Sequence, residues 1–232
     1  MSLFRKIFGQ KLASSKLIDK NEISRVINSE VSPTKLTKFG SKSIWVTIKS
    51  ESTKEVLESL DLIELEKKTW EEGITKIHNY SSYNEVFITE PFNGWVFVIG
   101  WGLPKPMSSG IENISNFINK LSKNFEEVQY FISQRTTDTS SWIKSINGVI
   151  KRVYLISDGM SLIKGHKTSV EEDYNFVDLN SSLANSEEYF ESNIYPELEH
   201  VYLINESWSI SPNELSEFNY LEKGFGYLAK LK

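Results

Sequence analysis

The fold is decided by the stretch Glu85-Val-Phe-Ile-Thr-Glu90-Pro-Phe-Asn-Gly94-Trp-Val-Phe-Val-Ile-Gly100-Trp-Gly-Leu-Pro104. Two runs rich in β-branched and aromatic residues flank Asn93-Gly94, a pair that favours tight hairpin turns because both residues tolerate positive φ. In the second run, residues 95–99, both sets of alternating side chains are apolar. A strand of this kind is covered on both faces, so the sequence predicts a hairpin inside a sheet.

Further strand-like runs lie before and after this hairpin, and Asn147-Gly148 joins two of them as a second Asn-Gly hairpin. Five or six strands connected by short turns, with helices inserted between the hairpins, predict an α+β fold. Its sheet is expected to be mainly antiparallel rather than a doubly wound parallel one. The further predicted strands are 43–49, 128–133, 140–146, 149–156, 160–164 and 224–229.

Amphipathic helices are predicted to cover this sheet, and capping boxes mark where several of them begin. In a capping box a Ser or Thr hydroxyl and a carboxylate three residues later satisfy free backbone amides. One box at Ser52–Glu55 begins a helix whose apolar stripe extends to Ile63. Further boxes at Thr69–Glu72 and Ser109–Glu112 begin two more helices.

The composition favours one soluble domain. Of the 232 residues, 39% are hydrophobic, which is ample for a packed core, and no Pro/Gly/Ser-rich linker divides the chain. We expect a single domain over residues 1–232, in which residues 1–40 form a basic, partly helical segment. Residues 185–232 are expected to form an acidic helical part packed on the sheet. The absence of Cys excludes disulfides and thiolate catalysis.

No apolar run is long enough to span a bilayer, and the first residues lack a secretory signal, so we expect a cytoplasmic location. The segment 1–12 nevertheless has Phe4, Ile7 and Phe8 on one helical face beside basic residues. Such a segment either touches an anionic membrane from its surface or forms a short terminal helix on the protein.

The net charge of −5 conceals a gradient along the chain. Residues 1–60 hold 11 Lys and Arg against 6 Asp and Glu, whereas residues 167–232 hold 4 against 13. An acidic surface repels nucleic acid, attracts basic partners and speeds their association. The sequence therefore favours a basic protein partner over nucleic acid, and a well-solvated acidic surface is the alternative.

Two helices are predicted in the acidic third. The first covers residues 186–193 with Asn185 and Glu188 as its cap pair, and the second begins with Pro196 at its first position. The carboxylates of these two helices are the candidate partner-binding residues. They are Glu187, Glu188, Glu191, Glu197 and Glu199.

No residues with a recognised catalytic spacing are present. The three histidines are isolated from carboxylates and from one another, so no metal site is expected, and no glycine-rich phosphate loop or nucleophile elbow indicates a cofactor. An enzyme or small-molecule site must then be built from residues that meet only in the fold. The candidates for such a pocket near the later strands are Arg135, Arg152, His166 and Glu171. Arg135 and Arg152 could bind a carboxylate or phosphate, but ion pairs with carboxylates within the fold are the favoured interpretation of both.

Aromatic residues alternate with basic residues on the later strands, in a pattern that can stack nucleic-acid bases. The acidic net charge argues against this interpretation, and a buried core position explains the same rings. The aromatic residues concerned are Tyr130, Phe131, Trp142 and Tyr154.

Core aromatic residues and turn glycines follow a particular order between residues 70 and 228. The order is Val86-Phe-Ile, Gly94-Trp95, Gly100-Trp-Gly-Leu-Pro104, Val128-Gln-Tyr-Phe131, Arg135, Trp142, Gly148, Arg152 and Trp208-Ser-Ile-Ser-Pro212. In this order the chain resembles a group of uncharacterised bacterial proteins. The resemblance implies a bacterial cytosolic protein with one continuous domain. Because the group has no established activity, it assigns no functional residue.

Two functional hypotheses follow. The first is a non-catalytic binding module, most plainly an immunity-type inhibitor that neutralises a bacterial toxin by covering it with a complementary acidic surface. The second is an enzyme or small-molecule-binding protein whose site lies near the later strands. The first hypothesis requires that a partner protein contacts the candidate carboxylates. The second requires that the four candidate pocket residues lie together in the fold.

Overall fold

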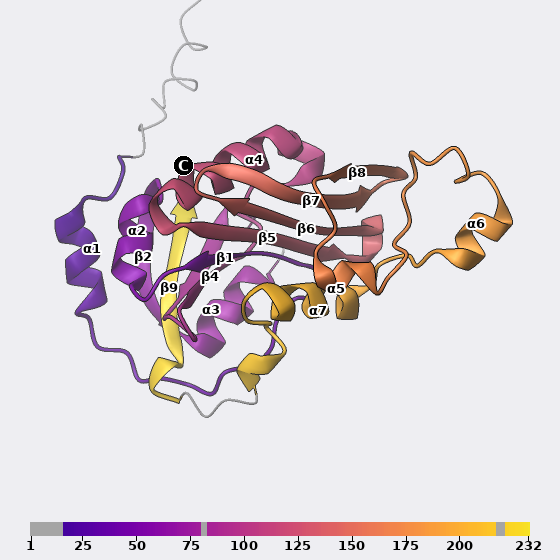
Figure 1. Cartoon of the computed structure of the whole chain (residues 1–232). Helices are drawn as coiled ribbons and strands as arrows, with labels where there is room; N and C mark the ends of the chain where they lie inside the picture. Colours follow the sequence, from indigo (N-terminus) through magenta and orange to yellow (C-terminus); the bar gives the residue numbers. More distant parts are fainter. Residues whose placement is uncertain (1–15, 80–82, 217–220) are drawn as a thin grey trace, which may run out of the picture.

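The structure is a computed structural model and describes residues 16–79, 83–216 and 221–232. Its centre is one nine-stranded sheet with the order β2-β9-β3-β4-β1-β5-β6-β7-β8, in which every neighbouring pair is antiparallel (Figure 1). The strands are β1 (Ser43–Lys49), β2 (Leu62–Thr69), β3 (Glu85–Thr89), β4 (Trp95–Ile99), β5 (Glu127–Gln134), β6 (Thr139–Ile146), β7 (Val149–Ser157), β8 (Met160–Lys164) and β9 (Phe225–Leu231).

Helices lie on both faces of this sheet, which confirms the α+β class with an antiparallel sheet. One face is covered by α1 (Lys20–Ile27), α2 (Thr53–Ser59) and α4 (Pro106–Phe125). The opposite face is covered by α3 (Trp70–Ile77), α5 (Ser169–Glu172) and α7 (Leu198–Trp208). The remaining helical segments are α6 (Glu187–Ser192) and the short η1 (Arg135–Thr137), η2 (Glu214–Ser216) and η3 (Leu221–Lys223).

The strand β4 lies between β3 and β1 near the middle of the sheet. It pairs with β3 through Phe87 and Ile99, and in the connection Asn93 and Gly94 have φ of 47° and 82°. Residues 96–99 are fully buried, with alternate side chains entering the two cores. The centre of the sheet is therefore covered on both sides, as its sequence predicts.

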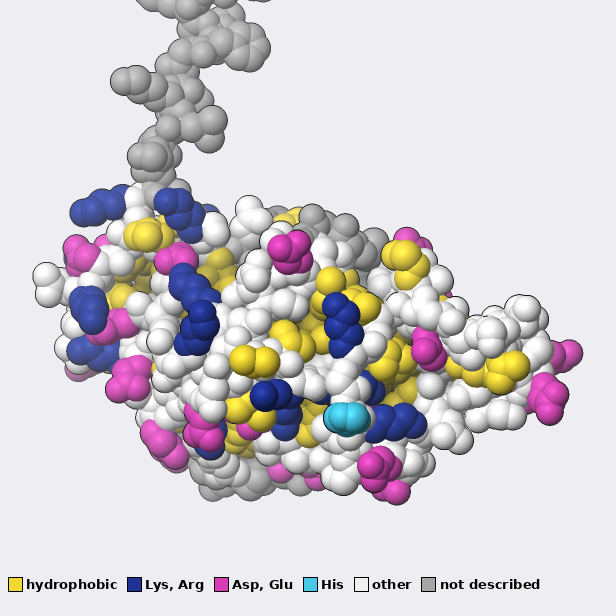
Figure 2. All heavy atoms as spheres, turned by 45° about the horizontal axis from the view of Figure 1, so that its top comes forward, with side chains coloured by type: hydrophobic (Ala, Val, Ile, Leu, Met, Phe, Trp, Pro, Cys, Tyr) yellow, Lys and Arg dark blue, Asp and Glu magenta, His cyan; other side chains and the backbone are white. Residues whose placement is uncertain are grey.

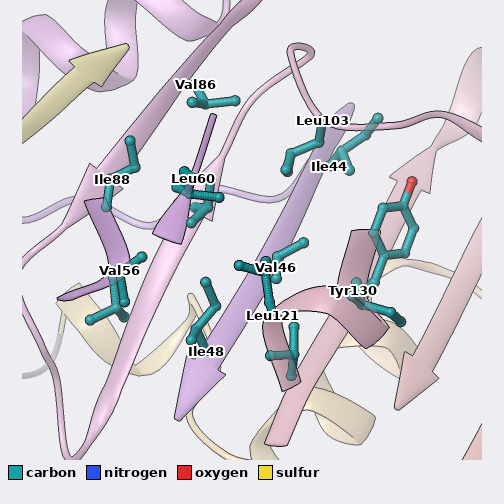
Figure 3. Close-up of a cluster of buried hydrophobic side chains, with 14 of the residues drawn as sticks. Ile44, Val46, Ile48, Val56, Leu60, Val86, Ile88, Leu103, Leu121 and Tyr130 are labelled. Atoms are coloured by element: carbon teal, nitrogen blue, oxygen red, sulfur yellow. The ribbon is translucent and has the colours of Figure 1, made fainter. Parts of the chain in front are cut away.

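The two cores differ in chemistry. Under α1, α2 and α4 the side chains are mostly aliphatic, and Figure 3 shows Val46 and Ile48 of β1 among side chains from α2, β3 and α4. Under α3 and α7 the core is aromatic, and Trp45 stacks on Phe131 with ring centroids 5.5 Å apart. The Trp45 indole also donates to the Asn205 side chain of α7 at 2.8 Å. Helix α7 is thus fixed to the sheet by apolar packing and by a buried hydrogen bond.

Some element boundaries differ from the sequence predictions. Ile63 does not extend the helix, because α2 ends at Ser59 and Leu60 is extended, and Ile63 lies in β2 instead. This strand carries charged residues on its less buried positions, so its sequence lacks a strong strand signal. The other eight strands overlap the runs predicted from the sequence, so β2 is the one strand of the described residues that was not predicted.

The starts of α6 and α7 also differ. Ser186, rather than Asn185, caps α6 by accepting a hydrogen bond from the Tyr189 amide at 3.3 Å. Helix α7 begins at Leu198, and Pro196 lies before it instead of at its first position. The Thr69–Glu72 capping box at α3 is present as the sequence predicts.

The C-terminal part has three separate positions in the fold. Helix α7 packs on the sheet, β9 lies inside the sheet between β2 and β3, and the segment 178–195 projects beyond the end of the sheet (Figure 1). We call this segment the arm. Within the part of the chain that the structure describes, no helix is both long and apolar enough to cross a membrane. The predicted membrane contact through residues 1–12 lies outside the described residues.

Candidate functional site

Arg152 and Glu171, two of the candidate pocket residues, form one buried ion pair. The Arg152 side chain is 4% exposed and that of Glu171 is 0% exposed. Arg152 Nε donates to both carboxylate oxygens of Glu171, at 2.9 and 3.1 Å. The Trp142 indole donates to Oε1 at 2.8 Å, and the Thr168 amide and hydroxyl donate to Oε2 at 2.9 and 2.8 Å. Both carboxylate oxygens are thus engaged, and the pair fastens α5 to the sheet.

The pKa of Glu171 reflects this environment. Burial alone raises the pKa of a carboxyl group because the charged form loses its hydration. Hydrogen bonds from Arg152, Thr168 and Trp142 outweigh this effect and hold the pKa of Glu171 below its ordinary value. The carboxylate therefore stays ionised at neutral pH and acts as a structural anchor.

The other two candidate pocket residues are not part of this ion pair, although His166 directly follows Gly165, whose carbonyl accepts from Arg152 Nη1 at 3.1 Å. His166 is exposed in the segment between β8 and α5. Arg135 is exposed in η1, next to the end of β6 at Thr139. In the register of the sheet, Arg152 of β7 lies opposite Lys144 of β6. Lys144 is five residues from Thr139, which corresponds to about 17 Å along the strand. The structure therefore joins Arg152 to Glu171 and places Arg135 at a different end of the sheet.

The four aromatic residues considered for base stacking are all buried. Tyr130, Phe131 and Trp142 are 0% exposed and Tyr154 is 1% exposed. Trp142 stacks on Tyr154 with ring centroids 4.2 Å apart. These four rings are core residues and cannot offer a stacking surface to nucleic acid.

The arm is held at its root by a small set of hydrogen bonds. A parallel bridge joins Phe176 to Ile194, where the Val177 amide donates to the Ile194 carbonyl at 3.1 Å. The Tyr189 hydroxyl accepts from the Asp178 amide at 2.8 Å and donates to the Asp178 carbonyl at 2.9 Å. These contacts close residues 178–195 into a defined loop rather than an open chain.

The root of the arm is also tied to the edge strand β8. Asp178 Oδ1 accepts from the Ser161 hydroxyl at 2.7 Å, and the Asn180 side-chain amide donates to the Ser161 carbonyl at 2.7 Å. Because Ser161 belongs to the sheet, the arm has a fixed starting position. The arm is therefore a protruding element with a rigid base.

The surface of the arm combines exposed apolar side chains with carboxylates. Leu183 is 63% exposed and Phe190 43%, and Ile194 and Tyr195 are 38% and 42% exposed. On the face that Figure 2 presents, the arm shows hydrophobic and acidic side chains together. The sequence from residue 168 to residue 222 contains no Lys or Arg. The arm is thus acidic and apolar at once, without a cation of its own.

The five candidate binding carboxylates fall into two groups. Glu187, Glu188 and Glu191 are exposed on α6, within the arm. Glu197 and Glu199 lie at the start of α7, where they line a cavity together with Arg135. None of the five forms an ion pair with another residue in the described ranges. The fold thus leaves these carboxylates without a cation, although the Glu197 side chain also accepts a hydrogen bond from the His200 amide in the cap of α7.

Sequence reasoning did not single out the apolar residues of the arm. Helical spacing assigns an apolar residue such as Phe190 to a buried face, although in the structure it faces solvent. A usable signal was present, because α6 is short and its segment holds large apolar residues among carboxylates. A short acidic helix of this kind has little neighbouring structure in which to bury them.

A larger cavity of about 880 Å³ lies at the other end of the sheet, between α3, β2 and β9. Its three lysines are all paired with carboxylates. The pairs are Lys230 with Glu64 at 2.7 Å, Lys68 with Glu66 at 2.6 Å and Lys76 with Glu85 at 3.6 Å. The cations of this cavity are thus engaged by carboxylates, although Glu85 Oε2 is buried without a hydrogen-bond partner.

Comparison with protein-family models, with curated proteins and with solved structures finds no match to this chain.

Proposed function

We propose that the protein is a non-catalytic binding module that neutralises a bacterial toxin by direct contact, as an immunity-type inhibitor does. The observation that carries this proposal is the arm, a protruding loop with unpaired carboxylates, exposed large apolar side chains and no cation. The setting that we propose is the cytoplasm of a bacterium, where the inhibitor meets its toxin before release.

The chemistry of the arm supports a protein partner. Exposed apolar side chains such as Phe190 and Tyr195 are the kind that carry most of the energy of protein interfaces when they enter a pocket of the partner. The carboxylates around them can stay hydrated at the solvent-exposed rim of the interface. From there they attract a basic partner and speed its association. An arm with both features fits a concave, basic surface, which is what a cationic toxin presents around its active site.

The shape of the arm supports inhibition in particular. A loop that projects from a sheet reaches into a cleft without requiring the sheet itself to approach. Its hydrogen-bonded root at Asp178 and Tyr189 lowers the ordering cost of binding because the loop is already closed. A preorganised projection is therefore suited to a tight one-to-one complex.

The first test is co-purification of the tagged full-length chain from its native cells, together with co-expression of the product of the neighbouring gene. We expect one basic protein to elute in stoichiometric amount, to be toxic when expressed alone and to be harmless beside the inhibitor. If the chain elutes alone and protects against no neighbouring gene product, inhibition by binding is wrong.

The second test maps the interface by charge reversal. Changing Glu187, Glu188 and Glu191 to Lys should weaken the complex by about a hundredfold and slow association most at low salt. The matched control changes three exposed carboxylates outside the arm by the same total charge: Glu30→Lys, Glu112→Lys and Glu222→Lys. Equal effects of the two triple variants would contradict a binding site on the arm.

The apolar part of the arm is tested separately. Phe190→Ala should speed dissociation by roughly tenfold and leave the association rate unchanged, since a buried anchor acts on complex lifetime. The exposed Val149, the first residue of β7, supplies the control variant Val149→Ala. If Phe190→Ala and Val149→Ala dissociate at the same rate, the apolar side chains are not part of the interface.

A further inference from the structure

A second site lies at the base of the arm, in a cavity of about 550 Å³. Its walls come from the turn at Ser41 and Lys42, from the connection between β5 and β6, and from the start of α7. This volume falls in the range of pockets that hold small molecules, about 300–1,000 Å³. The cavity is therefore large enough for a ligand of amino-acid size or somewhat larger.

Charges of both signs line this cavity without satisfying one another. Lys42 and Arg135 are the cations, and Asp138, Glu197 and Glu199 are the anions. Within the described ranges none of these five side chains forms an ion pair. This contrasts with the larger cavity beside α3, where each lysine has a carboxylate partner. Unpaired charges of opposite sign around one cavity suit a ligand that carries both charges itself.

The backbone keeps these charges in fixed positions. Lys42 and Asp138 both have positive φ, 54° and 43°, a conformation that few residues with side chains adopt. The start of α7 is fixed by two hydrogen bonds, from the Ser140 hydroxyl to the Pro196 carbonyl at 3.0 Å and from the Glu197 amide to His200 Nδ1 at 3.1 Å. The fold thus sets the spacing between the backbone positions that carry these charges.

A buried acceptor in the cavity wall also lacks a donor. Gln134 lines this cavity, and its amide nitrogen donates to the Thr136 hydroxyl at 2.8 Å, whereas its amide oxygen is buried without a hydrogen-bond partner. An unsatisfied buried acceptor is unfavourable, so a ligand that donates a hydrogen bond to Gln134 Oε1 would relieve this cost. Ammonium and guanidinium groups are such donors.

We propose that this cavity binds a small zwitterion. Arg135 and Lys42 hold its carboxylate, and the carboxylates of Asp138, Glu197 and Glu199 hold its ammonium or guanidinium group. The apolar faces of Tyr195, Pro196 and Leu198 contact the aliphatic chain between the two charged ends. An arginine fork gives the carboxylate two parallel hydrogen bonds, which makes Arg135 the main anion contact. The cavity shares Tyr195 with the arm and includes Glu197 and Glu199, whereas the three carboxylates of α6 lie outside it.

Three probes of nearly equal size test the two ends separately. They are 4-guanidinobutyrate, which carries both charges, butylguanidinium, which lacks the carboxylate, and 4-ureidobutyrate, which lacks the positive charge. We expect calorimetric titration of the full chain to give a dissociation constant of about 1 mM or lower for 4-guanidinobutyrate, and at least tenfold weaker binding of the other two. Absence of binding of 4-guanidinobutyrate at about 10 mM overturns the proposal.

Variants then assign each end of the ligand to its residues. Arg135→Gln should weaken 4-guanidinobutyrate at least tenfold and leave butylguanidinium unchanged, while Asp138→Asn with Glu199→Gln should weaken both. Glu112→Gln, on the outer surface of α4, is the control and should change neither. Thermal unfolding of each variant confirms that it is folded. If both sets of variants bind 4-guanidinobutyrate as the unmodified chain does, the ligand lies elsewhere and the proposal is wrong.

Discussion

Arg152 lies in β7, and Arg135 lies in η1 between β5 and β6. The side chains of these two arginines have opposite environments. Arg152 is 4% exposed, and it donates to Glu171 and to the carbonyls of the turn after β8. Arg135 is exposed on a cavity wall beside three carboxylates and pairs with none within the described residues. Two residues of the same type thus have different roles in this fold. A buried charge must be satisfied by the fold itself, whereas an exposed charge can be left for another molecule.

The largest expected effect comes from breaking the buried pair. Arg152→Met keeps the volume of the side chain but leaves Glu171 ionised and unpaired in the core, so it should lower the free energy of unfolding by about 3–5 kcal/mol. Arg135→Met, the matched change at the cavity, should lower it by no more than about 0.5 kcal/mol. Urea unfolding measured by fluorescence compares the two variants.

A second variant keeps this comparison informative if Arg152→Met does not fold. Arg152→Met combined with Glu171→Leu removes both charges and should recover most of the loss, because an apolar pair of similar size avoids the desolvation cost. A double variant as unstable as Arg152→Met alone would show that Arg152 stabilises the fold mainly through the turn carbonyls of Lys164 and Gly165.

The next effect is a difference in acid sensitivity. In the folded protein the pKa of Glu171 lies below its ordinary value of 4.5, so its ionised form stabilises the fold above that pH. This contribution is lost as the pH falls below about 4.5 and through the folded-state pKa. The free energy of unfolding of the unmodified chain should therefore decline more steeply with acid than that of Glu171→Gln. Parallel curves from pH 6 to pH 3 would mean that other carboxylates govern acid unfolding.

A smaller and local effect is expected at the root of the arm. Tyr189→Phe removes the hydroxyl that bonds both backbone groups of Asp178, so the arm should open more easily by about 1 kcal/mol, or roughly fivefold in local amide exchange. Amide hydrogen exchange over residues 178–195 measures this change, with strand β5 as an internal reference. Tyr83→Phe, at an exposed tyrosine outside the arm, should leave the exchange of the arm unaltered.

Local sequence signals predicted much of the sheet. The central hairpin follows from two apolar runs around Pro91–Gly94, and the start of α3 follows from Thr69 and Glu72, because in each case the determining residues are neighbours in the chain. The edge strand β2 was missed because its exposed positions are charged and its partner is β9, more than 150 residues later. Pairing across such a separation leaves no local pattern.

The candidate site was predictable only in part. The acidic third of the chain and its carboxylates are visible in the sequence, but the projection of the arm depends on Ser161, which holds Asp178 and Asn180. The cavity likewise combines Lys42, Arg135 and Glu199 from three distant segments. Sequence reasoning grouped Arg135 with Arg152 because both follow or lie in the later strands. Only the register of β6 and β7 separates them.

The smallest effect on the free energy of unfolding is expected at Asp138. This effect distinguishes the cavity from the buried Arg152 site. Asp138 has φ 43° and ψ 41°, a left-handed conformation that Asn adopts as readily as Asp. Asp138→Asn removes a charge without a partner, so the free energy of unfolding should change by less than about 0.5 kcal/mol in either direction. Its dependence on salt should also match that of the unmodified chain. Unfolding measured at low and high salt tests both statements. A loss above about 1 kcal/mol would tie Asp138 into the fold, and the cavity would then resemble the Arg152 site instead of differing from it.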